Sequence, residues 1–186
     1  MRALLALPLL LTVAAASPTY RYRLDEAQSK VAARVSFFGL ASKKAQFPRM
    51  TGSIALQPDR LDSIDLEVVL DARALTAGDG VTQARLKSAD FFDVANHPTV
   101  TFRGQRMTML SPVTAKVAGE VTARGVTRPA VLQVSFARPP ASAKPGEAVQ
   151  LSARTTIDRR EFGMTAYRLV VGRKVTVTID ARLVPG

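Results

Sequence analysis

Apolar and polar residues alternate along most of the chain in short runs, and residues that favour turns separate one run from the next. A period of two places every second side chain on the same face of a β-strand. The clearest runs lie at residues 31–37, 64–70, 99–107, 117–123, 132–136, 149–157 and 175–183, with weaker candidates at 20–25 and 50–57. The pattern therefore predicts eight or nine strands, each buried on one face.

The segments between these runs have the chemistry of turns. Residues 58–60 and 124–127 and the proline-rich loop 138–146 all suit connections between antiparallel strands. Residues 81–92 lack the period of two, which indicates a short helix or a loop with one helical turn. No linker or internal repeat interrupts the pattern, so a single domain is the simplest organisation. Regular antiparallel strands form either a sandwich or a closed barrel, and alternation does not choose between the two.

The first residues have the features of a secretory signal peptide. A positively charged start is followed by an apolar run over residues 3–13 and by three alanines at 14–16. The apolar run is shorter than the roughly 20 residues of a transmembrane helix, which favours a cleaved signal over a membrane anchor. We expect residues 1–16 to be a signal peptide and residues 17–186 to be one exported domain in the periplasm.

Composition excludes several kinds of site. The 186 residues include no cysteine and one histidine, so disulfides, thiol nucleophiles and zinc–thiolate centres are excluded and a metal site is not expected. The net charge of +11 is unevenly distributed: residues 17–100 contain 11 basic and 10 acidic residues, whereas residues 101–186 contain 14 and 5. This excess indicates an anionic partner such as a phosphate or a membrane surface, or a solvated basic face. Export argues against nucleic acid.

Residues that could perform catalysis are sparse. His97 lies in an Asn-His-Pro turn, and no Gly-x-Ser-x-Gly elbow is present. Asp90 and Asp93 could act as an acid and base pair, but their spacing suits a turn cap equally well. The sequence therefore favours a binding protein over an enzyme.

Four motifs resemble those of the YceI-like family of exported, lipocalin-like polyisoprenoid-binding proteins. They occur in the family's order and span nearly the whole mature chain. The two most specific are KSADFFDV at 87–94, followed by HPTVTF at 97–102, and IDRREFGM at 157–164. The other two are YRLD at 22–25 and GEVTARGVTRP at 119–129.

The resemblance implies an all-β fold, an extended eight-stranded antiparallel β-barrel of lipocalin-like type, with the short helical segment near 81–92. It also implies that the interior holds a long isoprenoid, such as a quinone tail or a polyprenyl phosphate, and it implies no catalysis. The chain departs from the family pattern at Gln28, Ala45 and residues 82–85. These departures concern the lipid head group and leave the fold unaffected.

Candidate site residues follow from aromatic clustering and charge. The candidates for lining a lipid site are Phe37, Phe47, Phe91, Phe92, Phe102, Phe162 and Met164. Because Phe91 and Phe92 lie outside any clear strand, the pair suits a plug at one mouth of the barrel. The candidates for an anionic head group or leaflet are Arg124, Arg128, Arg159 and Arg160.

The leading hypothesis is a periplasmic carrier that holds an isoprenoid-tailed lipid and transiently contacts an anionic membrane surface. It needs no cofactor besides the bound lipid. The alternative is a filled structural barrel whose basic face binds an envelope protein or polyanion. A monomer and a dimer both fit the pattern. An apolar tunnel would favour the carrier, and a packed core would favour the scaffold.

Overall fold

The computed structural model describes residues 18–57, 60–142, 144 and 146–186. The signal peptide expected at residues 1–16 lies outside the described residues and stays a prediction. Within the described part, eleven strands form one antiparallel sheet: β1 (Tyr20–Leu24), β2 (Lys30–Phe37), β3 (Ala41–Gln46), β4 (Met50–Leu56), β5 (Asp65–Asp71), β6 (Thr76–Ala77), β7 (Thr99–Ser111), β8 (Thr114–Ala123), β9 (Val126–Phe136), β10 (Val149–Asp158) and β11 (Val171–Pro185).

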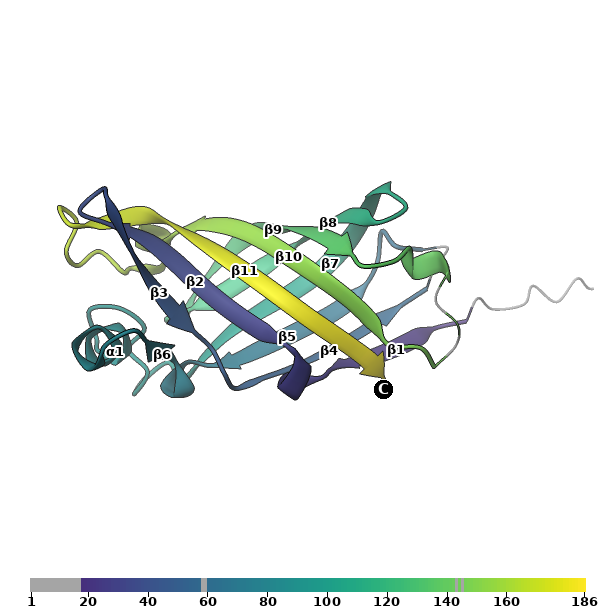
Figure 1. The fold of residues 1–186 in the computed structure, drawn as a ribbon, viewed down its shortest axis with the longest axis horizontal. Helices are drawn as coiled ribbons and strands as arrows, with labels where there is room; N and C mark the ends of the chain where they lie inside the picture. Colours follow the sequence, from purple (N-terminus) through teal and green to yellow (C-terminus); the bar gives the residue numbers. More distant parts are fainter. Residues whose placement is uncertain (1–17, 58–59, 143, 145) are drawn as a thin grey trace, which may run out of the picture.

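Eight of these strands close into a ring in the order β1-β4-β5-β7-β8-β9-β10-β11, and pairing of β1 with β11 completes it. The long strand β11 pairs with β2 over residues 171–180 and with β1 over residues 183–185. After the break that follows β1, β2 takes the place of β1 beside β11. Strand β3 then pairs with β2, and β6 pairs with β3. The structure confirms the predicted eight-stranded antiparallel barrel, which Figure 1 shows along its length.

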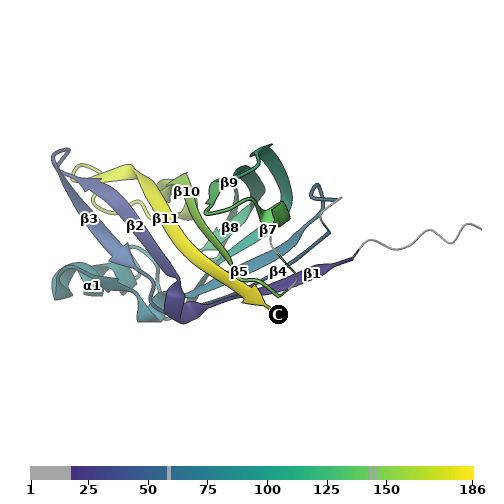
Figure 2. The same cartoon turned by 45° about the vertical axis from the view of Figure 1, so that its right-hand side comes forward.

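The two ends of the barrel differ. At one end, which we call the helix end, lie helix α1 (Gly80–Lys87), the β2–β3 turn and the long β10–β11 loop (Figures 1 and 2). At the opposite end, the loop end, lie the β7–β8 turn, the β9–β10 loop and the C-terminus. The described residues also include short 3-10 turns at Glu26–Gln28, Ala72–Ala74, Pro140–Ser142 and Arg159–Phe162.

The alternating sequence pattern has a direct structural cause. Along β10, Ala153 is buried, whereas Ser152 and Arg154 on either side of it are exposed. Every second residue of a barrel strand faces the interior, so the apolar positions of the runs predicted from sequence point inward. Strands β7 and β8 approach closely at Gly119. A Cβ atom at this position would lie 2.1 Å from the Arg103 carbonyl oxygen, so the approach requires glycine.

The predicted helical segment 81–92 is helical only in its first part. Helix α1 ends at Lys87, where the Ser88 hydroxyl donates to the Arg85 carbonyl over 2.8 Å. The following residues form consecutive turns, in which the Phe91 and Asp93 amides donate to the Ser88 carbonyl. Both the amide and the hydroxyl of Ser88 thus donate to the Arg85 carbonyl, one of the last carbonyls of the helix.

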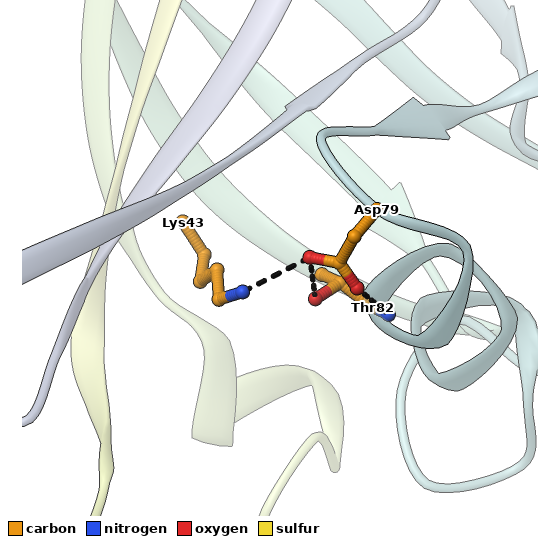
Figure 3. Close-up of polar contacts among 3 residues, drawn as sticks. All are labelled: Lys43, Asp79 and Thr82. Atoms are coloured by element: carbon orange, nitrogen blue, oxygen red, sulfur yellow. Dashed lines mark hydrogen bonds and ion pairs between the residues drawn. The ribbon is translucent and has the colours of Figure 1, made fainter.

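Capping by Asp79 positions helix α1, none of whose residues is buried. The Asp79 carboxylate accepts hydrogen bonds from the Thr82 amide at 2.7 Å and the Thr82 hydroxyl at 2.8 Å. It also accepts from the Lys43 ammonium of β3 at 3.0 Å, which joins the helix to the sheet (Figure 3). The bonds from Thr82, followed by that from Lys43, lower the pKa of Asp79 from 3.8 to about 2.

We predict that Asp79→Ala lowers the melting temperature at neutral pH more than Asp79→Asn, since asparagine can retain the cap bond but not the ion pair. The folded-state pKa lies below the unfolded value, so the stabilisation is complete above about pH 4 and is lost as the pH falls towards 2. Thermal unfolding between pH 7 and pH 2 should show the difference between Asp79→Ala and wild type shrinking. Asp62→Ala, at an exposed carboxylate, is the control; equal effects at Asp62 and Asp79 would contradict the capping role.

Candidate functional site

The interior of the barrel contains a cavity of about 860 Å³. Inward side chains from all eight strands of the ring, together with β2, form its wall, which is almost entirely apolar. The wall extends from Leu110 and Pro139 at the loop end to Phe162 and Met164 at the helix end. This volume lies at the upper end of the roughly 300–1,000 Å³ typical of ligand pockets. The interior is therefore an apolar cavity that extends along the barrel rather than a packed core, and we call it the tunnel.

Aromatic side chains line the tunnel towards the helix end. The rings of Phe47 and Phe92 meet edge to face, with centroids 5.8 Å apart and planes at 81°. Phe162, which is 1% exposed, and Met164, which is 6% exposed, lie on the same part of the wall. Phe102 of β7 lies further along the tunnel. The structure thus places these five predicted residues on one continuous surface.

Two other predicted lining residues do not lie on the wall. Phe91 is buried behind it, where its ring stacks on Tyr167 at 6.0 Å and the Arg159 guanidinium lies 5.7 Å from its centroid. Phe37 is at the end of β2, where its ring meets the exposed ring of Phe38 at 4.7 Å. Neither Phe37 nor Phe91 is among the side chains that line the cavity, and their expected contact with a lipid stays a prediction.

Arg159 is the one charged residue on the tunnel wall among the residues that the structure describes. It is 3% exposed. Its Nε donates to the Gly172 carbonyl at 2.9 Å, its Nη2 to the Val171 carbonyl at 2.9 Å, and its Nη1 to the Met164 carbonyl. Arg159, at the start of the β10–β11 loop, thereby holds the loop at Met164 and the beginning of β11 at Val171 and Gly172.

The charge of Arg159 is only partly balanced. In the described part of the chain, no carboxylate oxygen lies within 4.0 Å of its guanidinium nitrogens. Burial lowers the pKa of Arg159, the adjacent Arg160 lowers it further, and Asp158 opposes the shift. A guanidinium has five N–H donors, and three of them are used for the carbonyls above. The site can therefore offer hydrogen bonds and positive charge to a polar group at this end of the tunnel.

The other three predicted arginines do not gather around the tunnel. Arg124 donates to the carbonyls of Gly163 and Ala89 and so links the β8–β9 turn to two segments of the helix end. Arg128 is exposed and donates to the neighbouring Thr127 carbonyl. Arg160 is exposed as well. Of the four candidates for a head group, the structure places Arg159 alone in contact with the cavity.

Most of the wall consists of aliphatic strand residues that were not singled out as site candidates. Leu66, Val68, Val177 and Ile179 are examples. They belong to the inward faces that the period of two already identifies, so the signal was present in the alternation. Tyr167, which stacks on Phe91, lies in a loop and has no such periodic signal.

Two further features bear on chemistry. The His97 imidazole packs against the backbone of the β8–β9 turn, so that a side chain at Gly125 would meet His Cε1 at 2.8 Å. In the described residues, no three histidine or acidic side chains gather as a metal site. The same residues include no helix with the length and apolar character needed to span a membrane.

Comparison with known proteins shows what this chain is similar to. A family model described as the YceI-like domain matches residues 22–183. A UPF0312 protein of Pseudomonas putida is 25% identical over 164 residues, which are 87% of this chain and 85% of that protein. A UPF0312 protein of Vibrio cholerae is 22% identical over 138 residues, 74% of this chain and 73% of the relative.

Solved structures show the same fold. The crystal structure of Burkholderia cenocepacia BcnA has a TM-score of 0.75 at 18% identity and covers 86% of this chain and 98% of its own. A polyisoprenoid binding domain from Saccharophagus degradans, implicated in plant cell wall breakdown, has a TM-score of 0.67 at 16% identity. Its match covers 89% of this chain and 98% of the domain.

Proposed function

The chain belongs to the YceI-like family, and on that premise we propose that it binds an isoprenoid-tailed lipid inside its barrel, without catalysis. The observation that carries the proposal is the apolar tunnel of about 860 Å³. The similar domain from Saccharophagus degradans is a polyisoprenoid binding domain, which supports the same ligand class. With the expected signal peptide at residues 1–16, the chain would act as a periplasmic lipid carrier.

The physical basis of binding is removal of the tail from water. Each buried CH2 group contributes roughly 0.8 kcal/mol, so a tail of several five-carbon units is strongly driven into an apolar wall. A lipid bilayer offers a similar gain. The barrel therefore suits exchange of the lipid with a membrane, because neither environment retains the tail irreversibly.

Arg159 orients the ligand in this proposal. Among the described residues that line the tunnel, Arg159 is the charged one, and its guanidinium lies at the helix end. We assign the polar head, a quinone carbonyl or a phosphate oxygen, to this end, and the tail to the tunnel leading towards Leu110 at the loop end. A charged donor strengthens such a hydrogen bond, and more so in an apolar setting.

The alternative function, a filled barrel that binds an envelope protein through its basic face, requires a packed interior. The tunnel favours the lipid carrier over that scaffold. Two of the four predicted arginines are also engaged with backbone carbonyls away from the tunnel wall, Arg124 with Gly163 and Ala89 and Arg128 with Thr127.

Native mass spectrometry tests the proposal directly. Purified mature chain is incubated with vesicles that contain either a long-chain ubiquinone or undecaprenyl phosphate, and then separated from them. We expect a one-to-one adduct with at least one of these probes and none with an unbranched, saturated phosphatidylcholine. A homogeneous mass of the unliganded chain with every probe would contradict the proposed function.

A further inference from the structure

Large apolar side chains face solvent at the helix end. Leu40 is 99% exposed and Leu169 is 100% exposed, while Phe38 and Tyr167 are 65% and 41% exposed. We call these four residues the apolar rim. They lie on the β2–β3 turn and on the β10–β11 loop, outside the barrel wall. Single exposed apolar residues are common on proteins, but a group of them on adjacent loops marks an interaction surface.

The two segments that carry the rim are joined to each other. The Phe38 amide donates to the Val170 carbonyl over 2.8 Å, and Phe37 pairs with Val171 where β2 meets β11. Both views of the fold show the β2–β3 turn beside the β10–β11 loop (Figures 1 and 2). The rim is therefore a single surface built from two distant parts of the sequence.

Two residues of the rim have an uncommon backbone conformation. Phe38 and Tyr167 both have positive φ, 52° and 55°, a conformation that is uncommon for residues other than glycine and especially for bulky ones. Such a backbone persists when the surroundings hold it and is often found at functional sites. Here it holds aromatic residues at the outer edge of the molecule, next to two fully exposed leucines.

Positive charge surrounds the rim. Residues 34–44 and 160–174, which contain it, include one acidic residue, Glu161, and seven basic residues, namely Arg34, Lys43, Lys44, Arg160, Arg168, Arg173 and Lys174. Arg85 of α1 adds a further cation, whose guanidinium lies 5.0 Å from the ring centroid of Tyr167. Lys43 and Arg173 each have an acidic neighbour, Asp79 at 3.0 Å and Asp158 at 3.9 Å, and the excess of basic residues remains.

From these observations we propose that the helix end docks onto an anionic lipid bilayer, with the apolar rim inserted among the lipids and the surrounding basic residues over their phosphates. The proposal rests on the proposed function, because a carrier of a membrane lipid must meet a membrane. Protruding apolar turns with basic flanks match the two attractions that hold peripheral proteins, burial of apolar surface and attraction to anionic headgroups.

The docking surface lies beside the aromatic end of the tunnel. The β10–β11 loop that presents Leu169 to solvent also contributes Phe162 and Met164 to the tunnel wall. Tyr167 of the rim stacks on Phe91, and the Arg159 guanidinium lies 5.7 Å from the centroid of the same Phe91 ring. A docked rim therefore places the head-group end of the tunnel, as assigned above, next to the membrane surface.

Vesicle flotation tests the proposal. Wild type should float with phosphatidylcholine vesicles that contain phosphatidylglycerol and much less with pure phosphatidylcholine, and added salt should weaken binding. We expect Leu40→Ser/Leu169→Ser to lose about tenfold or more in partitioning, and Lys44→Glu/Arg168→Glu to lose a similar amount on the anionic vesicles alone. Val131→Ser, at an apolar residue of β9 that is 47% exposed and does not line the tunnel, is the matched control and should bind as wild type does.

Three outcomes would overturn the docking proposal: wild type failing to float with anionic vesicles, the double serine variant floating equally well, or sedimentation showing a dimer that this variant disrupts. The last would assign the rim to a second copy of the chain. Uptake of ubiquinone from a detergent dispersion, followed by native mass spectrometry, separates the two proposals. The double serine variant should load normally there, and a chain that floats with vesicles but never loads would contradict the lipid-binding function alone.

Discussion

Replacing Ala33 by tryptophan is expected to weaken binding of a long isoprenoid by about a thousandfold. Ala33 lies on β2 and faces the tunnel. An indole at this position occupies space that the tail would fill and displaces at least one five-carbon unit. At roughly 0.8 kcal/mol per carbon group, the loss is about 4 kcal/mol, or three powers of ten in affinity.

The neighbouring alanine provides a matched control. Ala32 pairs with Gln46 and Thr178 on the outer face of the same strand and does not line the tunnel. Ala32→Trp should therefore bind the isoprenoid as wild type does. Because the chain contains no tryptophan, each variant carries a single indole whose emission reports its surroundings, blue-shifted inside the tunnel at 33 and red-shifted at 32.

Thermal unfolding separates blocked binding from failed folding. The indole of Ala33→Trp enters an existing cavity, so it should not overpack the core in the way a large residue does at a filled site. We expect both variants to unfold cooperatively near the wild-type temperature. Equal affinities of Ala33→Trp and Ala32→Trp for ubiquinone, measured by equilibrium titration, would show that the tail does not occupy this part of the tunnel.

The strands could be predicted from sequence wherever one face meets the tunnel and the other meets water. That condition holds along β10, where the run 149–157 nearly matches the observed bounds, and along the part of β11 that the run 175–183 covers. It fails for β3, where Ala45 is the one buried residue and two adjacent lysines follow the exposed Ser42. Pairing with β2 and β6, which is a tertiary property, defines this strand.

Closure of the sheet could not be obtained from alternation, because a sandwich buries every second residue in the same way. What completes the ring is the break between β1 and β2, which lets both pair along β11. In the sequence this break is a short stretch around Gln28, without the proline or glycine that would mark it. The family resemblance, rather than the period of two, identified the barrel.

The candidate site shows the same limit. Phe91 and Phe92 are adjacent and lie in turns, and the sequence offers no rule for which of them faces the tunnel. The structure directs Phe92 to the wall and Phe91 to Tyr167. Arg159 and Arg160 are likewise adjacent and alike in sequence, yet a single 3-10 turn buries the first and exposes the second. The difference between neighbouring side chains depends on local backbone direction.

The second large effect is expected for the buried residue of this pair: Arg159→Met should lower the free energy of unfolding by about 3 kcal/mol. The substitution leaves the carbonyls of Met164, Val171 and Gly172 without their donor, and a buried group deprived of its partner costs about 1–3 kcal/mol. Chemical denaturation should show the loss, with a fall of roughly 10 °C in melting temperature. Arg160→Met, at the exposed neighbour, should change stability by less than about 0.5 kcal/mol. If both variants were equally stable, Arg159 would not hold the β10–β11 loop.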